Sequence, residues 1–559
     1  MVYSNPDVIE RICDNAGEED NVTDSYFSAI ADNNNDASVI ADNNNDGDGS
    51  SDVRRFFENT SVFITGGSGF LGMTLIEKLL RSCPGIKRLF LLMRSRKGKT
   101  AEERATDMFL NPLFFPLLEN SPRILQKVKI IQGDIEQPNL GISTSDMILL
   151  EEEVEIVYHV AATINFDEAL RKAYQVNVTS TKTLLTMAES MARLKAFVHV
   201  STLFCHVHCR KRVEEKFYLS HCTEEDIEAL LNLADDYTIA VLSKRLLDKV
   251  PNTYALTKAI AENVIMRKKD KLPIAVYRPG IVMNTHSEPI RGWNLSVQGA
   301  GALILGTGLG ILRVLRVNGN KIADIIPVDK CANILATLPW YIHKSRQENN
   351  KEVKIYNHVS NKETWRNLTE HSLGFIESKK ASSKFQIWAV HSDFETNRLR
   401  FNIKFFLYHV LPLPFFVLAE KLQKQRPRLR KVYIKIAYLI DQLSFFTQED
   451  FKFEDGSIQK LWSCMSKLDQ QQFHFDVSNW DWKDYTRCLG QGYAHYVMGE
   501  SMEKVKLNWK KHQRLLWLDR MILYPIKGLL LFIAYKLGIS IISLFKSYLD
   551  HQINRIYEL

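Results

Sequence analysis

The chain has 559 residues, enough for about two to four domains. An apolar fraction of 45% and a charged fraction of 25% are those of an ordinary globular protein, which excludes a fibrous or wholly disordered chain. The net charge of +7 conceals an acidic start, because residues 1–52 carry thirteen Asp or Glu against one Arg. The remainder is therefore strongly basic and suited to anionic substrates, phosphates or an anionic membrane surface.

Nucleic acid is not a predicted partner, because the basic charge comes with no helix-turn-helix, zinc-finger or RNA-binding signature. The first twenty residues lack the basic segment and apolar core of a secretory signal, and the eight cysteines are scattered. We therefore expect reduced thiols and a body that faces the cytosol. The run Cys-His-Val-His-Cys from Cys205 to Cys209 matches none of the usual paired-ligand spacings, so no metal site is predicted.

The chain opens with a predicted disordered tail over residues 1–52. The segment Ile-Ala-Asp-Asn-Asn-Asn-Asp occurs at residues 30–36 and again at residues 40–46. Such repeats bury too little apolar surface to offset the conformational entropy that ordering would cost.

A glycine-rich loop, TGGSGFLG, follows the apolar run Ser61–Ile64 and precedes a predicted helix over Met73–Leu80. A strand, a glycine turn and a helix together are typical of a site for the pyrophosphate of a dinucleotide. Gly66 would allow the tight turn, Gly69 the approach of phosphate to the backbone, and Gly72 the packing of helix on strand. Taken alone, the same pattern also fits an ordinary glycine turn.

From about residue 56, strand-like runs alternate with helical stretches, which predicts an α/β fold with a doubly wound parallel sheet. One such stretch, Asn177–Arg193, is predicted as a helix with Leu184, Leu185 and Ala188 on one face. The predicted strands are Val62–Thr65, Arg88–Met93, Lys127–Gln132, Ile156–Val160, Ala196–Val200 and Pro273–Tyr277.

Basic residues, beginning with Arg94, follow the second predicted strand. A site for NAD usually has Asp or Glu here for the ribose 2′-hydroxyl, whereas a site for NADP has Arg. A guanidinium can bind the 2′-phosphate through two parallel hydrogen bonds. The position therefore favours NADPH, and the alternative is a solvated basic turn.

Two further motifs predict hydride chemistry on a carbonyl group. Tyr254 and Lys258 lie four residues apart, so a helix would place both on one face. A nearby ammonium lowers the pKa of a tyrosine, which could then act as a general acid. Ser201 and Thr202 follow a strand at the edge that faces the ligand crevice, where a hydroxyl can bond the carbonyl oxygen. The alternatives are a chance surface Tyr–Lys pair and a Ser/Thr turn.

Beyond about residue 340 the alternation stops, and a second, mainly helical domain is predicted over residues 360–500. The prolines of Leu411–Pro414 should break the helical pattern of Phe401–Glu420. Residues 520–549 are largely apolar and predict membrane attachment, preceded by the basic segment Lys504–Arg520. With Lys536 inside this stretch, three arrangements stay open: one tilted span, an interfacial hairpin broken near Gly538, or a buried helix.

Together these motifs resemble the extended short-chain dehydrogenase/reductase superfamily and, more narrowly, the alcohol-forming fatty acyl-CoA reductases. The resemblance covers about residues 56–500 and implies a Rossmann-type NADP-binding domain at residues 56–345 and a mainly helical C-terminal domain at residues 360–500, in addition to the membrane segment that composition predicts at residues 520–549. The matching segments are TGGSGFLG, LLMRSRKG, GDI, VYHVAATINFDEAL, FVHVST, YALTK and YRPGIV, with Phe473–Asp476, Trp480, Trp482 and Tyr485 in the C-terminal domain.

The resemblance implies a role for each matched residue. Tyr254 and Lys258 would be the catalytic pair, with Thr202, or as the second choice Ser201, as the hydroxyl partner. Asn177 would support the active-site network. The residues implied around the cofactor are Gly66, Gly69, Phe70, Leu71, Gly72, Arg94, Asp134, Ile135, Ala161, Ala162, Asn177 and Lys258.

The implied activity is the NADPH-dependent reduction of a long-chain fatty acyl-CoA, through an aldehyde, to a primary alcohol and CoA at a membrane. One rival is another membrane-bound extended reductase that acts on a sterol or lipid alcohol. Another is a catalytically silent, nucleotide-binding membrane scaffold. The terminal Tyr-Glu-Leu differs from the Ser-Lys-Leu address of peroxisomes, which favours the endoplasmic reticulum. A homo-oligomer is compatible with the sequence, which leaves the oligomeric state open.

Overall fold

The computed structural model describes residues 51–208, 212–297, 299–349, 352–360, 363–378, 382–422, 429–478, 480–500 and 508–557. The predicted acidic tail lies outside the described residues up to position 50, as do Cys209 and residues 504–507 of the basic segment. Ser51 and Asp52, the last residues of the predicted tail, are described: Ser51 caps helix α2 (Asp52–Phe57), and Asp52 begins it.

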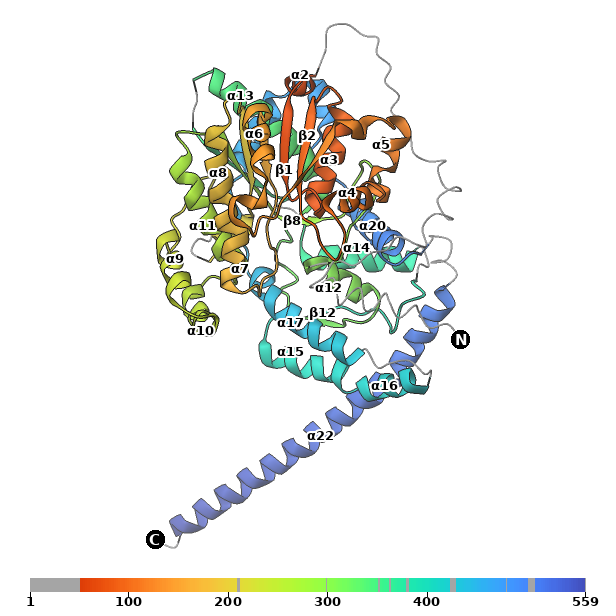
Figure 1. Ribbon diagram of the computed structural model, residues 1–559. Helices are drawn as coiled ribbons and strands as arrows, with labels where there is room; N and C mark the ends of the chain where they lie inside the picture. Colours follow the sequence, from red (N-terminus) through yellow and green to blue (C-terminus); the bar gives the residue numbers. More distant parts are fainter. Residues whose placement is uncertain are drawn as a thin grey trace.

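A seven-stranded parallel sheet forms the centre of the molecule, in the order β11-β7-β5-β4-β1-β2-β3 (Figure 1). This Rossmann-type arrangement confirms the predicted fold class, and each of the six predicted strands is present within two residues of its expected limits. The seventh strand, β11, was not predicted, because three of its five residues, Lys354, Asn357 and His358, are polar and they do not alternate with apolar residues. The strands are β1 (Ser61–Thr65), β2 (Arg88–Met93), β3 (Val128–Gln132), β4 (Ile156–His159), β5 (Ala196–Val200), β7 (Ile274–Pro279) and β11 (Lys354–His358).

Alternate strand residues face two separate apolar cores, one on each side of the sheet. Val62 and Ile64 face the core under α3 and α13, whereas Phe63 faces the core under α6, α8 and α11. Leu184 and Leu185 of α8 are buried there, as the predicted helix requires. These helices are α3 (Phe70–Ser82), α13 (Val328–Gln347), α6 (Thr144–Glu153), α8 (Ser180–Ser190) and α11 (Thr253–Lys268), with α4 (Ala101–Phe109) and α5 (Phe115–Asn120) beside α3.

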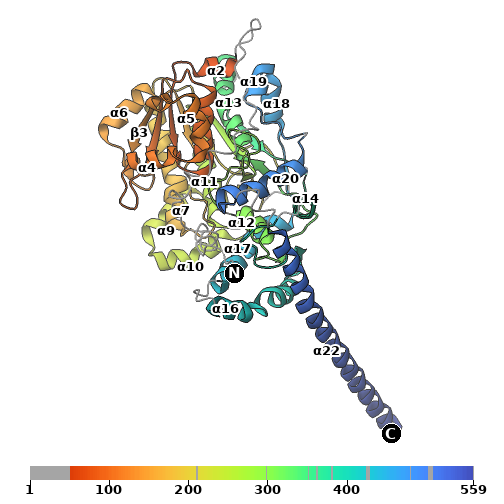
Figure 2. The same cartoon turned by 90° about the vertical axis from the view of Figure 1, so that its right-hand side faces the viewer.

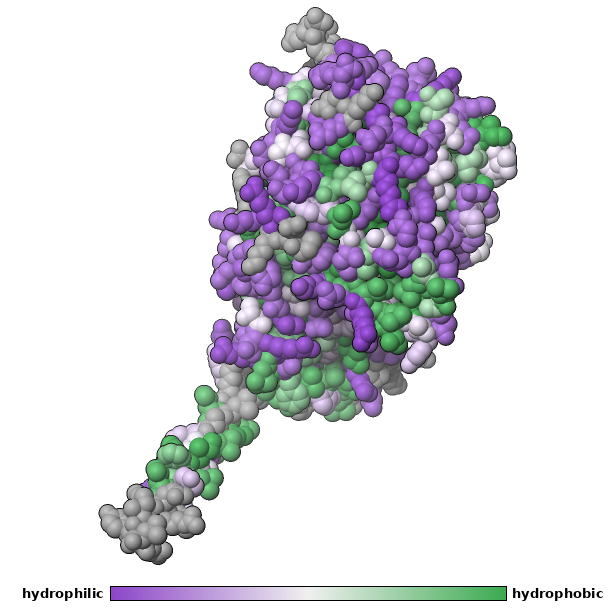
Figure 3. Space-filling view, turned by 90° about the vertical axis from the view of Figure 1, so that its left-hand side faces the viewer, coloured by the Kyte–Doolittle hydropathy of each residue, from purple (hydrophilic) through white to green (hydrophobic). Residues whose placement is uncertain are grey.

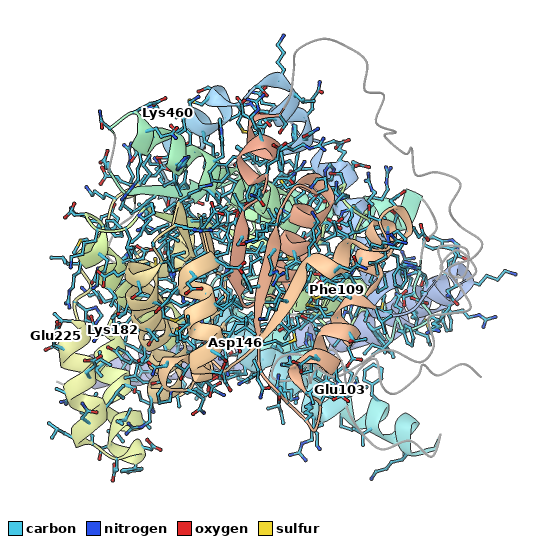
Figure 4. The ribbon with its side chains drawn as sticks, turned by 45° about the horizontal axis from the view of Figure 1, so that its top comes forward. Glu103, Phe109, Asp146, Lys182, Glu225 and Lys460 are labelled. Carbon is cyan, nitrogen blue, oxygen red and sulfur yellow. The ribbon has the colours of Figure 1, made fainter. Side chains whose placement is uncertain are left out.

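Helices α9 (Glu224–Leu233) and α10 (Asp236–Leu247) extend the second face of the sheet. Lys182 of α8 holds this extension through ion pairs with Glu224 and Glu228, at 2.5 and 3.2 Å. Figure 4 shows Lys182 and the neighbouring Glu225 at this edge of the molecule.

A third apolar core lies beside the sheet and, with most of the predicted C-terminal helical domain, forms the second unit of the molecule, the sheet and its helices being the first. The two units interleave, because Leu303, Leu312 and Val317 of the predicted Rossmann domain belong to this third core. Conversely, Leu461, Phe473 and Phe475 pack into the core under α3 and α13. The helices are α12 (Gly299–Gly308), α14 (Trp365–Ser378), α15 (Arg398–Phe405), α16 (Leu413–Leu422), α17 (Leu429–Gln448), α18 (Gly456–Cys464), α19 (Lys467–Gln472) and α20 (Trp482–Gly492). Short parallel strand pairs join β8 (Ile281–Met283) to β10 (Ile325–Pro327), β9 (Val314–Leu315) to β12 (Asp393–Phe394), and β6 (Arg212–Val213) to β13 (Lys452–Phe453).

Helix α22 (Trp509–Tyr557) projects from the lower end of the body as one continuous rod (Figures 1 and 2). Its segment Leu531–Leu549 is, among the described residues, the one helix segment long and apolar enough to cross a membrane, and none of it is buried. The helix runs through Gly538 without a break, so the hairpin and the buried helix do not describe it. The predicted break at Leu411–Pro414 is confirmed, because a turn at residues 411–412 separates α15 and its continuation from α16.

Candidate active site

The glycine loop lies at the carboxyl end of β1, against the loop that follows β4. The strand order reverses between β1 and β4, which is where the ligand crevice of a doubly wound sheet opens. Gly66 has a φ of +74°, and a Cβ there would lie 2.5 Å from the backbone nitrogen of Ala161. A Cβ at Gly72 would overlap the carbonyl oxygen of Gly66. The turn and the packing of α3 on the loop therefore both require glycine.

The amino end of α3 has the form of a phosphate cradle. Gly69 is its N-cap, and the first turn, beginning at Phe70 and Leu71, has neither a side-chain cap nor an acidic residue. Its first N–H groups and the positive end of the helix dipole are therefore available to an anion. Ala161 lies against the Gly66 turn after β4, and the half-buried Ala162 follows it in the chain. The cradle fits the pyrophosphate of a dinucleotide.

Arg94 lies directly after β2 and is half-exposed. Its guanidinium pairs with the carboxylates of Asp134 and Glu136, at 3.3 and 3.1 Å. Two predicted cofactor residues, Arg94 and Asp134, thus lie together beside the cradle. Ile135, the next residue in the chain, packs against the core under α6, α8 and α11. A phosphate that binds Arg94 would have to share the guanidinium with these carboxylates.

Asn177 connects the loop after β4 to α11. It lies in a π-helical turn, η4 (Gln175–Thr179), before α8. Its side-chain oxygen accepts a hydrogen bond from the backbone N–H of Thr163 at 2.9 Å, and its amide donates to the hydroxyl of Thr257 at 2.9 Å. The predicted supporting role of Asn177 thus has a geometric basis.

Tyr254, Lys258 and Thr202 meet at the carboxyl end of β5. The side chain of Thr202 lies beside that of Tyr254, where its hydroxyl favours the ionised form of the tyrosine and so acts against the rise in the Tyr254 pKa that burial causes. The ammonium of Lys258, one helical turn further along α11, donates to the carbonyl oxygen of Val200 at 2.8 Å. A proton donor, a second hydroxyl and a cation therefore surround one point at the edge of the sheet.

The electrostatics of this group differ from the sequence-based expectation. Burial raises the pKa of Tyr254 above its usual value, and Lys258 does not offset this, because its ammonium is directed to the Val200 carbonyl. Burial also lowers the pKa of Lys258 to about 8. The expected lowering of the Tyr254 pKa is therefore absent from this state of the protein.

Ser201, the second-choice hydroxyl, faces a different partner. Its hydroxyl donates to Glu262 at 2.5 Å, and this buried carboxylate also pairs with Arg278 at 2.5 Å and with His206 at 3.0 Å. Although burial disfavours its charge, Cys205 and Glu262 raise the pKa of His206 to about 10. Sequence reasoning missed this buried ion cluster, although Glu262 lies one turn after Lys258 on the same helix.

Aromatic rings from both units cover the side of Tyr254. Phe166 stacks on Tyr254 with ring centroids 5.9 Å apart, and Phe446 of α17 lies 5.8 Å from Phe166. Phe204, directly after the catalytic strand, contacts Phe446 at 5.4 Å. The second unit thus supplies apolar surface near the Tyr254 side chain, which no motif of the sequence indicated.

Comparison with known proteins gives a consistent result. An NAD-binding family model and a second model, both described as male sterility protein, match residues 64–335 and 408–500. A fatty acyl-CoA reductase of Drosophila melanogaster is 35% identical, over 83% of this chain and 89% of its own. Fatty acyl-CoA reductase 1 of Xenopus laevis is 32% identical, over 80% of this chain and 87% of its own. A reductase domain of a nonribosomal peptide synthetase from Mycobacterium tuberculosis shares the fold, with a TM-score of 0.53, 17% identity and coverage of 79% of this chain and 92% of that domain.

Proposed function

Because the chain belongs to the fatty acyl-CoA reductase family, we propose that it reduces a long-chain fatty acyl-CoA to the primary alcohol and CoA, with NADPH as the reductant and an aldehyde as the intermediate. The observation that carries this proposal is the placement of the Tyr254 and Thr202 side chains beside one another at the end of β5, together with Lys258 and an apolar ring surface. Such a group can act on a carbonyl that is attached to an apolar chain.

The cofactor site fits a nicotinamide dinucleotide through the glycine cradle and the uncapped end of α3. Gly66, Gly69 and Gly72 would hold the pyrophosphate, and Arg94 would bind the 2′-phosphate that distinguishes NADPH from NADH. Bound NADPH would supply the hydride for both reductions.

The protein's own groups would manage charge and protons. The hydroxyls of Thr202 and Tyr254 would donate hydrogen bonds to the carbonyl oxygen as negative charge develops on it. Collapse of the hemithioacetal would release the CoA thiolate and leave the aldehyde. In the second reduction Tyr254 would give its proton to the alkoxide, and the cationic Lys258 would stabilise the tyrosinate that remains.

The surroundings of the site support an apolar substrate and a membrane. Phe166 and Phe446 would contact the acyl chain near the thioester, and α22 would attach the protein to a bilayer that can take up the alcohol. The catalytic body would face the cytosol. The endoplasmic reticulum, which the sequence favours over the peroxisome, stays a prediction.

The test is the substitution Tyr254→Phe in the full-length protein, with Tyr237→Phe on exposed α10 as the matched control. We expect Tyr254→Phe to lower alcohol formation from acyl-CoA and NADPH by about 10²-fold or more, measured by mass spectrometry, with unchanged binding of NADPH by fluorescence. Tyr237→Phe should keep full activity. Full activity of Tyr254→Phe would refute the catalytic role, and a wild type that forms no alcohol would refute the proposed reaction.

A further inference from the structure

A row of large apolar side chains lies exposed on α15 and on the π-helical turn η6 (Phe406–Val410) that continues it. Leu399, Ile403 and Phe406 are 69%, 53% and 52% exposed, and Val410 completes the row. Their spacing of four, three and four residues places all of them on one side of the helix.

The other side of this helix is also apolar and is packed. Phe401 and His409 are buried, and His409 meets the ring of Tyr433 on α17 at 5.2 Å. A surface helix of a water-soluble domain normally shows a polar outer face, so an apolar outer face indicates a further partner. Figure 3 shows apolar residues gathered at this lower end of the body.

The position of the row identifies that partner. Helices α15 and α16 lie at the end of the body from which α22 departs in two perpendicular views (Figures 1 and 2). Trp388 joins the two parts, because its ring contacts Phe416 of α16 at 5.2 Å and its indole N–H donates to Asp519 of α22 at 2.5 Å. The exposed Leu411 and Leu418 extend the apolar surface toward this junction.

Basic side chains flank the apolar row. Arg398 and Arg400 are exposed on α15, and Arg430 and Lys431 are exposed at the start of α17. An apolar helical face bordered by Lys and Arg is the pattern of a helix that lies in the headgroup layer of a membrane with anionic lipid.

We propose that Leu399, Ile403, Phe406 and Val410, together with Leu411 and Leu418, form a second membrane contact that rests in the headgroup layer of an anionic bilayer beside α22. The body is then held at two places, and α17 runs from this surface, at Tyr433, to the ring of Phe446 near the catalytic tyrosine. This contact is independent of the reaction proposed above.

The experiment measures the depth of labelled side chains in the full-length protein, reconstituted in vesicles of phosphatidylcholine and phosphatidylserine. Among the described cysteines Cys464 is the exposed one, so Cys464→Ser, combined with Cys13→Ser and Cys209→Ser at the two cysteines outside the described residues, serves as the labelling background. Ile403→Cys reports on the proposed surface, Ile542→Cys on the exposed face of α22, and Leu233→Cys on exposed α9, away from both. Each variant carries a fluorescent label whose quenching by doxyl lipids is compared with quenching by aqueous iodide.

We expect doxyl-lipid quenching at least several-fold above background at positions 403 and 542, and quenching by iodide alone at position 233. Quenching by lipid at position 542 with iodide access at position 403 would overturn the second contact while α22 remains an anchor. Iodide access at both positions would overturn it as well. Alcohol formation by the unlabelled protein tests the proposed reaction separately.

Discussion

Neighbouring hydroxyls at the end of β5 have different partners because side chains alternate across a strand. Ser201 points to the buried Glu262, whereas Thr202 points to Tyr254. From the sequence alone, Thr202 was the first choice and Ser201 the second choice for the hydroxyl partner of Tyr254. The packing of α11 on β5 distinguishes them, because it gives each hydroxyl a different neighbour.

Two substitutions test this division. Thr202→Val keeps the shape of the side chain but removes the hydroxyl, and we expect a loss of about 10²-fold in kcat, with a loss of about 1 kcal/mol in stability because the hydroxyl also accepts a hydrogen bond from the Phe204 N–H. Ser201→Ala should keep activity within a few-fold and cost about 1 kcal/mol of stability, because Glu262 loses one hydrogen bond. Steady-state kinetics and urea unfolding measure the two effects. The opposite pattern, with Ser201→Ala inactive, would exchange the two roles.

The pKa of Lys258 predicts a pH dependence. Burial lowers this pKa to about 8, so the ammonium is present below that pH and is lost above it. If the cation supports Tyr254, kcat/KM for acyl-CoA reduction should fall as the pH rises through about 8. Lys258→Arg keeps a cation at all these pH values and should move the fall to higher pH, even if its maximal rate is lower. A fall at the same pH in both proteins would assign it to another group.

The position of Arg94 predicts a preference for NADPH over NADH. Arg94→Ala should raise KM for NADPH about 10-fold to 100-fold, because charge-assisted hydrogen bonds to the 2′-phosphate are lost. KM for NADH, which lacks that phosphate, should change little. Lys97→Ala, in the same turn and exposed, is the control. Equal effects on both cofactors would show that Arg94 acts through the shape of the loop instead.

At the scale of elements, the sequence predicted what local pattern determines. The core strands are short apolar runs, which the sequence shows directly. The glycine loop requires glycine for steric reasons, and the spacing of its glycines in the sequence already indicated this requirement. Strand β11 was not predicted, because its burial comes from neighbours that are distant in sequence. The direction of the Tyr254 pKa shift was predicted wrongly, because it depends on where the Lys258 ammonium points.

The packing of α3 on the loop gives a test at this scale. In Gly72→Ala the new Cβ would overlap the carbonyl oxygen of Gly66, so we expect a loss of about 1–3 kcal/mol in stability and weaker NADPH binding. In Gly67→Ala the Cβ would meet the ends of two side chains, Ile76 at 3.0 Å and Leu91 at 3.6 Å; the closer one can move, and the other is at ordinary contact distance. Thermal unfolding with and without NADPH compares the two variants. Equal tolerance would mean that the helix can shift on the strand.

At the scale of the whole molecule, the interleaving of the two units could not be read from local pattern. The sequence predicted two consecutive domains, yet α18 and α19 return to cover the sheet. Phe446 of α17 also contacts Phe166, which stacks on Tyr254. Such contacts depend on long-range packing, which leaves no periodic signal in a single chain.

The contact between α2 and α19 joins the start of the described chain to its C-terminal part. The buried carboxylate of Asp469 accepts hydrogen bonds from the Ser51 hydroxyl at 2.5 Å, from the Asp52 N–H at 3.2 Å and from the Ser466 hydroxyl at 2.7 Å. In Asp469→Asn an amide N–H₂ replaces one acceptor oxygen. This N–H₂ donor would then face hydroxyl or N–H groups that donate to the carboxylate in the native protein. We expect a loss of about 1–3 kcal/mol, seen as a lower urea midpoint, with unchanged kcat because the contact is remote from Tyr254.

The control for this prediction is Asp235→Asn, which keeps an equally good cap on the exposed end of α10 and should change stability by less than about 0.5 kcal/mol. If Asp469→Asn were no more destabilising than this control, α19 would not secure the amino-terminal helix. If it lowered kcat as well, the sheet would depend on this contact for the geometry of its active edge, and the two interleaved units would have to be treated as one catalytic body.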